Sequence, residues 1–142
     1  MAVNAPSIYP ALRYRDAKAA VEWLQRAFGF EPLMVVPGEA AGEGGVSHAE
    51  LKLGNGVVML GSFLGTPAPS QDDGIGTAPM TIYAVVDDPD AHCERAKSAG
   101  AEIIRELENM DYGSREYSAR DPEGYIWSFG TYVPDMKGAS NG

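Results

Sequence analysis

The sequence repeats one arrangement of strand and helix signals, and this repeat constrains the fold more than any other feature. Asp16 and Asp88 lie 72 positions apart, and each follows an apolar strand-like run and can cap the first turn of a helix. Pro89 fits the first position of the second helix. Gly29 and Gly100, 71 positions apart, can adopt the left-handed conformation that ends a helix. The chain is therefore predicted to fold as two copies of one unit.

Each unit is predicted to contain a strand, a helix and three further strands. The predicted strands are 7–14, 32–36, 46–53 and 56–62 in the first unit, and 80–86, 102–107, 115–119 and 125–132 in the second. The expected fold class is α+β, with two tandem βαβββ modules. The 142 residues are interpreted as a single domain, with module one at about 7–62, a linker at about 63–79, module two at about 80–132 and a tail at 133–142.

The composition argues against several classes of protein. A total of 20 acidic against 11 basic residues gives a formal net charge of -9, which disfavours binding to the phosphate backbone of nucleic acids. Cys93 is the single cysteine, so the chain can form neither an internal disulfide nor a multi-cysteine metal site. No apolar stretch approaches the roughly 20 residues of a membrane span, and the first residues lack the features of a signal peptide. These observations predict a cytoplasmic protein with no membrane or nucleic-acid partner.

Four segments of the chain resemble a known family. They are 9–16 (YPALRYRD), 27–30 (AFGF), 48–53 (HAELKL) and, most strongly, 112–131 (YGSREYSARDPEGYIWSFGT). These segments are similar to those of the vicinal oxygen chelate (VOC) superfamily, the glyoxalase, bleomycin-resistance and dioxygenase group, and in particular to its small bacterial glyoxalase-like branch. The resemblance covers about 7–132. It implies that the two modules form an incompletely closed eight-stranded barrel, completed in a homodimer, with a small-molecule site in the concavity.

The resemblance also indicates where a divalent metal would bind in the metalloenzymes of this family. The corresponding positions hold Tyr9, Met59 or Leu60 (depending on a one-residue choice of alignment), Thr81 and Ser128. A catalytic metal site needs about three strong protein ligands, such as His or Glu, and none of these residues is one. The sequence therefore predicts no bound metal and no other cofactor.

Alternation of side chains along a strand extends this comparison to ligand-binding residues. If Ser128 points into the concavity, Tyr9, Arg13, Met59 and Tyr83 are expected to do so as well, and Trp127 is expected to face the core. The predicted ligand-binding residues are Tyr9, Arg13, His48, Met59, Thr81, Tyr83, Tyr117 and Ser128. The orientation of Tyr117 is not fixed by any sequence pattern.

His48 and Glu50 are the candidate catalytic residues, since they are expected to share the face of their strand that lies opposite Leu51 and Leu53. Three roles for His48 remain open at this point: a hydrogen bond within the sheet, contact with a ligand, or a weak metal site shared with Glu50. A metal site at this pair lacks an evident third ligand.

Three functions are compatible with these residues. The first is binding of a small, partly aromatic molecule in the concave cavity without a catalytic metal. The second is a metal-dependent glyoxalase-type lyase, isomerase or dioxygenase, which the fold permits but the residues at the ligand positions do not support. The third is a metal-free enzyme in which His48, Glu50 or Tyr9 transfers a proton. Metal content tests the second function, and turnover without metal separates the third from the first.

Overall fold

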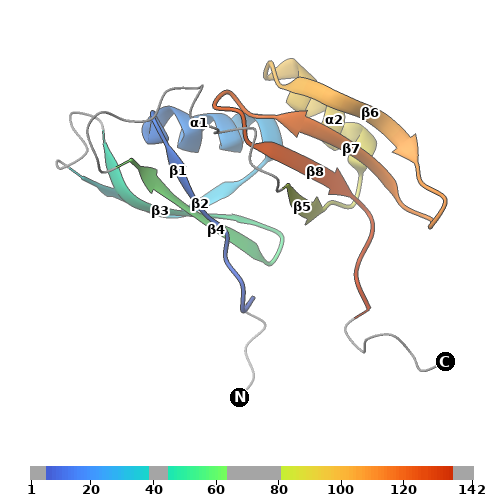
Figure 1. Ribbon diagram of the computed structural model, residues 1–142, viewed down its shortest axis with the longest axis horizontal. Coiled ribbons are helices and arrows are strands. Elements are labelled where there is room, and N and C mark those ends of the chain that lie inside the picture. Colours follow the sequence, from blue (N-terminus) through green and yellow to red (C-terminus); the bar gives the residue numbers. More distant parts are fainter. Residues whose placement is uncertain (1–5, 39–44, 64–80, 136–142) are drawn as a thin grey trace.

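A computed structural model describes residues 6–38, 45–63 and 81–135 of the chain (Figure 1). The elements of the first half are β1 (Ala11–Tyr14), α1 (Ala17–Phe28), β2 (Glu31–Pro37), β3 (Val46–Leu53) and β4 (Gly56–Ser62); those of the second half are β5 (Ile82–Val85), α2 (Pro89–Ser98), β6 (Glu102–Asn109), β7 (Arg115–Arg120) and β8 (Ile126–Gly130). Neither of these helices is long and apolar enough to cross a membrane. The predicted linker beyond residue 63 and the tail beyond residue 135 lie outside the described residues.

The strands form two four-stranded mixed sheets with equivalent topology, which confirms the prediction of two βαβββ modules. The strand orders are β1-β4-β3-β2 and β5-β8-β7-β6. In each sheet the first strand pairs in parallel with the fourth, and the other pairs are antiparallel. Figure 1 shows α1 and α2 next to each other on one side of the two sheets. The opposite side is called the open face below, since neither helix covers it.

The predicted helix caps are present. The Asp16 side chain accepts a hydrogen bond from the backbone N–H of Ala19 at 3.1 Å, and the Asp88 side chain accepts the equivalent bond from Ala91 at 3.1 Å. Gly29 has a φ of 84° and ends α1 in the left-handed conformation. The second helix ends at Ser98, two residues before the predicted end at position 100. These short-range interactions fix both helix starts, which explains why the repeat was visible in the sequence.

Aromatic side chains from both modules share one core. Phe28, at the end of α1, packs against Trp127 and Phe129 of β8, with ring centroids 5.6 and 4.7 Å apart. His92 of α2 donates through Nε2 to the carbonyl oxygen of Phe28 at 2.8 Å, so its Nδ1 accepts from the Tyr117 hydroxyl at 2.6 Å. Burial lowers the pKa of His92 below its ordinary value, which favours this neutral form. The modules are thus joined through their interiors.

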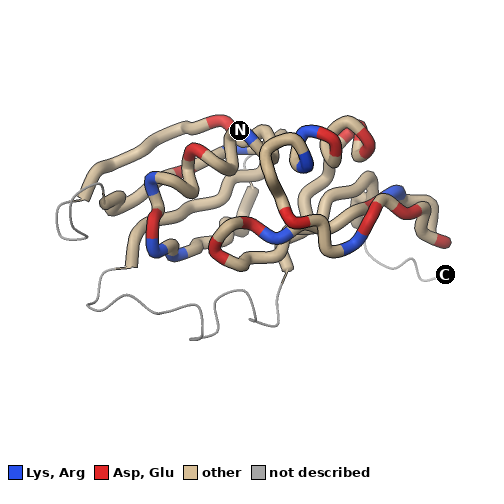
Figure 2. Tube along the Cα trace, turned by 90° about the horizontal axis from the view of Figure 1, so that it is seen from above, with Lys and Arg blue, Asp and Glu red and all other residues tan. Residues whose placement is uncertain are grey.

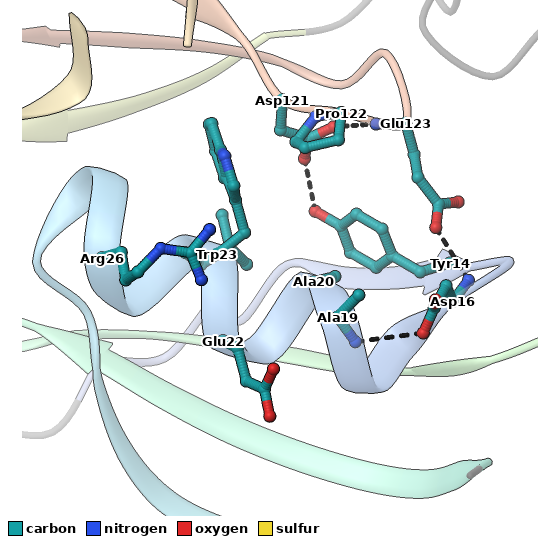
Figure 3. A pocket seen from close by; sticks show the side chains of 11 residues that line it. Tyr14, Asp16, Ala19, Ala20, Glu22, Trp23, Arg26, Asp121, Pro122 and Glu123 are labelled. Carbon is teal, nitrogen blue, oxygen red and sulfur yellow. Dashed lines mark hydrogen bonds between the residues drawn. The ribbon is translucent and has the colours of Figure 1, made fainter. Parts of the chain in front are cut away.

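A turn of module two is also hydrogen-bonded to the start of module one (Figure 3). The Tyr14 hydroxyl donates to Asp121 Oδ2 at 2.7 Å, and the Glu123 carboxylate accepts from the backbone N–H groups of Arg15 and Asp16 at 2.6 and 2.8 Å. These contacts bound a cavity of about 300 Å³ on the helix side of the molecule, with Trp23 in its wall. Asp121 and Glu123 therefore fix the entry to α1 from more than 100 residues away in the sequence.

Among the strands that begin later than predicted, two affect predicted site residues. The first strand starts at Ala11 rather than at position 7, so Tyr9 precedes it. Pro10 has no N–H for a ladder, although its carbonyl oxygen accepts from the Met59 N–H at 2.8 Å. The fifth strand starts at Ile82, which leaves Thr81 before it and exposed. The alternation argument therefore does not apply to Tyr9 or Thr81.

Candidate functional site

Alternating burial along the strands identifies the residues of the open face. In β1, Leu12 and Tyr14 are buried against the helices and Arg13 is exposed on the other side. The same pattern and the strand register place Met59 beside Glu50 in the first sheet. In the second sheet they place Tyr83 beside Ser128. Arg13, His48, Glu50, Met59, Tyr83 and Ser128 lie on open faces, the first four on sheet one and the last two on sheet two.

Trp127 and Tyr117, two aromatic residues considered in the sequence analysis, both lie on the helix side of sheet two. Trp127 is fully buried, which confirms its predicted place in the core. Tyr117 is also fully buried, and its hydroxyl contacts His92. The sequence left the orientation of Tyr117 open, and the structure places its side chain in the core rather than on the open face with the other predicted ligand-binding residues. Pairing of Tyr117 with Phe129 across β7 and β8 puts both rings on the same side of the sheet, and the sequence alone did not contain this register.

His48 and Glu50 are brought together on sheet one. Nε2 of His48 lies 2.8 Å from Oε2 of Glu50, and both side chains are partly exposed. Within the described residues there is no group of three His, Cys, Asp or Glu side chains arranged to hold a metal ion. The pair is therefore a hydrogen-bonded acid and base on an accessible surface, which suits proton transfer or polar contact with a ligand.

Arg13 lies along the backbone of β4. Its Nη1 donates to the carbonyl oxygen of Ser62 at 3.1 Å. A Cβ atom at Gly61 would lie 2.7 Å from the same nitrogen, so the glycine makes room for the guanidinium group. Arg13 is thus held close to the sheet.

A polar cluster on sheet two surrounds Glu116, a residue that sequence reasoning missed. Glu116 is 4% exposed and accepts from the hydroxyls of Tyr83 at 3.0 Å and Tyr112 at 2.9 Å. Nη2 of Arg105 lies 3.4 Å from its Oε1. Burial acts to raise the pKa of Glu116, but hydrogen bonds, the largest contribution coming from Tyr112, hold it below the ordinary value for a glutamate. The buried carboxylate is therefore ionised and fully partnered.

Gly130 makes this cluster possible. A Cβ atom there would lie 2.5 Å from both Cγ of Glu116 and the hydroxyl oxygen of Tyr83. Glu116 and Gly130 are paired across β7 and β8, on the same face as Ser128. A glycine inside a predicted strand is the signal that could have indicated a close contact here.

A cavity of about 530 Å³ lies between the modules, next to this cluster. Among the predicted ligand-binding residues, Tyr83 lines this cavity. Tyr9 is not one of the lining residues, but its neighbours Ile8 and Pro10 are. The remaining lining is mostly apolar; the residues are Ile8, Pro10, Phe30, Leu53, Gly54, Asn55, Gly56, Val57, Val58, Ile82, Tyr83, Ala84, Val85 and Trp127. A cavity of this size with an apolar wall and few polar groups is typical of small-molecule sites.

The residues at the four expected metal positions do not fit a divalent ion. Leu60 is buried on the helix side, so Met59 is the residue at the second position that faces outward. The donors are then a phenol at Tyr9, a thioether at Met59 and hydroxyls at Thr81 and Ser128, and the Ser128 hydroxyl already contacts Ser118 at 2.7 Å. Strong ligands for catalytic metals are imidazole, carboxylate or thiolate groups.

Comparison with known proteins gives consistent matches. Residues 8–129 match the sequence profile of the glyoxalase/bleomycin resistance protein/dioxygenase superfamily. Two mycobacterial relatives, the uncharacterized proteins Mb0911c of Mycobacterium bovis and Rv0887c of Mycobacterium tuberculosis, are each 33% identical over 140 residues; these span 96% of this chain and 90% and 81% of the respective relatives. Among solved structures, TioX from Micromonospora sp. ML1 is 32% identical with a TM-score of 0.69, covering 92% of this chain and 99% of its own. The fosfomycin resistance protein FosX from Mesorhizobium loti, 14% identical with a TM-score of 0.61 over 97% of this chain and 100% of its own, shares the fold.

Proposed function

Because the chain belongs to the glyoxalase/bleomycin resistance protein/dioxygenase superfamily, we propose that it binds a small, partly aromatic molecule at the cavity between its modules, without a catalytic metal. The observation that carries this proposal is the 530 Å³ cavity with Tyr83 in its wall. Glu116 and the backbone N–H of Tyr132 both bind the Tyr83 hydroxyl at 3.0 Å. A ring held in this way loses little conformational entropy when a flat ligand packs against it.

A metal-dependent lyase, isomerase or dioxygenase is less well supported. The donors at Tyr9, Met59, Thr81 and Ser128 are weak ligands, so no reaction step can be assigned to a metal held by them. Metal-free proton transfer by His48 and Glu50 is the second candidate function, and the 2.8 Å contact between these accessible groups supports it. Turnover in the absence of metal would favour this second function.

Removal of the Tyr83 ring tests the binding proposal. Once a thermal-shift screen of aromatic metabolites and antibiotics has identified a ligand, we expect Tyr83→Ala to weaken its binding by about 1–3 kcal/mol, the usual cost of losing a buried aromatic contact. Tyr9→Ala is expected to act in the same direction, since the neighbours of Tyr9 line the cavity. Tyr83→Phe is the matched control because it keeps the ring. Normal binding by both alanine variants, measured by calorimetry, would contradict the proposed site.

Chelation tests the absence of a catalytic metal. Protein purified without a nickel column is expected to contain well under one equivalent of transition metal. Its melting temperature should then be unchanged by a chelator, because a tightly bound ion would stabilise the native state by mass action. Elemental analysis that finds a stoichiometric ion, lost when His48 and Glu50 are replaced, would instead favour the metalloenzyme.

We also propose that the protein forms a homodimer. Strand β2 is an edge strand of sheet one, and four consecutive apolar side chains on it, Leu33, Met34, Val35 and Val36, are 41–52% exposed. An edge strand has unpaired backbone N–H and C=O groups that can bond to a second chain, and exposed apolar patches often mark protein–protein contacts. Light scattering at micromolar concentration is expected to give twice the 15.1 kDa mass of the chain. A monomer under these conditions would contradict the dimer.

A further inference from the structure

Three polar side chains form a row across the open face of sheet two. Nη2 of Arg105 lies 3.4 Å from Oγ of Ser118, and Oγ of Ser118 lies 2.7 Å from Oγ of Ser128. Ser118 pairs with Ser128 between β7 and β8, and Ser128 pairs with Tyr83 between β8 and β5. The row therefore begins at a guanidinium group and ends at Ser128, next to Tyr83 on the open face. Tyr83 also lines the cavity, whereas Ser128 is not one of its lining residues.

The chemistry of these groups determines which one donates in each hydrogen bond of the row. A guanidinium group can only donate, so Ser118 accepts from Arg105. Ser118 is 5% exposed, and a buried hydroxyl without an acceptor is costly. Among the contacts of the described residues, Ser128 Oγ is the oxygen that can accept the Ser118 proton. Ser118 therefore donates to Ser128, and the two bonds strengthen each other.

Ser128 is left with its own proton. Its oxygen accepts from Ser118, and its side chain is only half-buried on the open face. Glu116, the carboxylate of the cluster, is already bonded to Tyr83, Tyr112 and Arg105. Within 6–38, 45–63 and 81–135, no acceptor is seen for the Ser128 O–H, which can therefore donate to a ligand on the open face next to Tyr83.

We propose that the Arg105–Ser118–Ser128 row selects ligands that carry an acceptor oxygen, such as a ketone or quinone carbonyl, adjacent to an aromatic ring. This inference rests on the proposed binding of aromatic molecules and specifies their chemical class. The aromatic ring packs on Tyr83 and the carbonyl oxygen accepts from Ser128. An arene without the carbonyl would leave the Ser128 donor desolvated and unpaired, at a cost in affinity.

A matched pair of probes tests this selectivity. Anthraquinone sulfonate and anthracene sulfonate have similar planar shapes and the same charge, so the repulsion from the acidic protein cancels in the ratio of their dissociation constants. We expect the wild-type protein to bind the quinone about ten-fold more tightly, the ratio that one hydrogen bond provides. In Ser128→Ala this ratio should fall to about one. In Ser47→Ala, the same substitution at an exposed serine of sheet one, it should stay near ten.

Each result of the titration calorimetry is decisive. A ten-fold preference that disappears only in Ser128→Ala supports the inference. Binding of both probes with equal affinity by the wild type, a measurement that needs no variant, leaves the aromatic site in place and overturns the donor role of Ser128. A preference that survives in Ser128→Ala also overturns that role. Binding of neither probe overturns the inference together with the proposed aromatic site.

Discussion

Replacing Trp127 with alanine is expected to lower the free energy of unfolding by about 3–5 kcal/mol, the usual effect of deleting a buried tryptophan. The side chain is fully buried, and its ring packs against Phe28, Phe30 and Phe129. Its Nε1 also donates to Asp121 at 3.1 Å. The substitution therefore leaves a cavity where the two modules meet and removes one partner of a buried carboxylate. Urea denaturation monitored by circular dichroism measures the loss.

Val85 provides the control for this experiment. It is 46% exposed on the adjacent strand β5, so Val85→Ala should change stability by less than about 0.5 kcal/mol. A loss below about 1 kcal/mol for Trp127→Ala would show that the indole is not part of the core and that the register of β8 is wrong.

Replacing Asp121 with alanine is expected to lower the free energy of unfolding by about 3–5 kcal/mol, since each buried donor left without an acceptor costs about 1–3 kcal/mol. Asp121 is 3% exposed and accepts four hydrogen bonds, from the Tyr14 hydroxyl, Trp127 Nε1 and the backbone N–H groups of Glu123 and Tyr125. Burial raises the pKa of Asp121 in spite of these bonds. Alanine would leave the donors of Tyr14 and Trp127 buried without an acceptor, and the loss is again measured by urea denaturation.

Tyr14→Phe separates this network effect from simple packing. The variant keeps the ring and removes one donor, so it should cost about 1 kcal/mol. The double variant Asp121→Ala and Tyr14→Phe should lose less than the sum of the two single variants, because no buried hydroxyl remains unpaired. Strict additivity would argue against the hydrogen bond seen at 2.7 Å.

The parts of this fold that depend on neighbouring residues could be predicted from the sequence. Asp16, Gly29 and Asp88 determine the ends of their helices through contacts within a few positions, and the two modules followed from their spacing. Alternation along a strand, with Ser128 assigned to the concave side by the family resemblance, correctly predicted Trp127 in the core. Arg13 lies on the opposite, open side of its own sheet. In each case the physical cause lies within one element.

The parts that depend on pairing between strands could not be predicted in the same way. Tyr117 faces the core because of its register with Phe129, and a shift of one residue would have reversed it. Glu116 is important because Tyr83, Tyr112 and Gly130 come from three other segments to meet it. Tyr9 lies outside its strand because the ladder with β4 begins only at Ala11. Apart from Gly130, a glycine inside a predicted strand, no local pattern in the sequence indicates these contacts.

The aromatic interior shared by α1 and β8 limits how this protein can be recombined with its relatives. Each sheet is complete by itself, which suggests that a module could be exchanged for that of another family member. However, Phe28 and Phe30 of the first module pack against Trp127 of the second. His92 of the second module is also hydrogen-bonded to the carbonyl oxygen of Phe28. A chimaera would contain only one side of this complementary set. The two modules are therefore structural repeats that cannot be exchanged independently. A module moved into a relative would fold stably only if the aromatic residues that pack against it in the other module were moved as well.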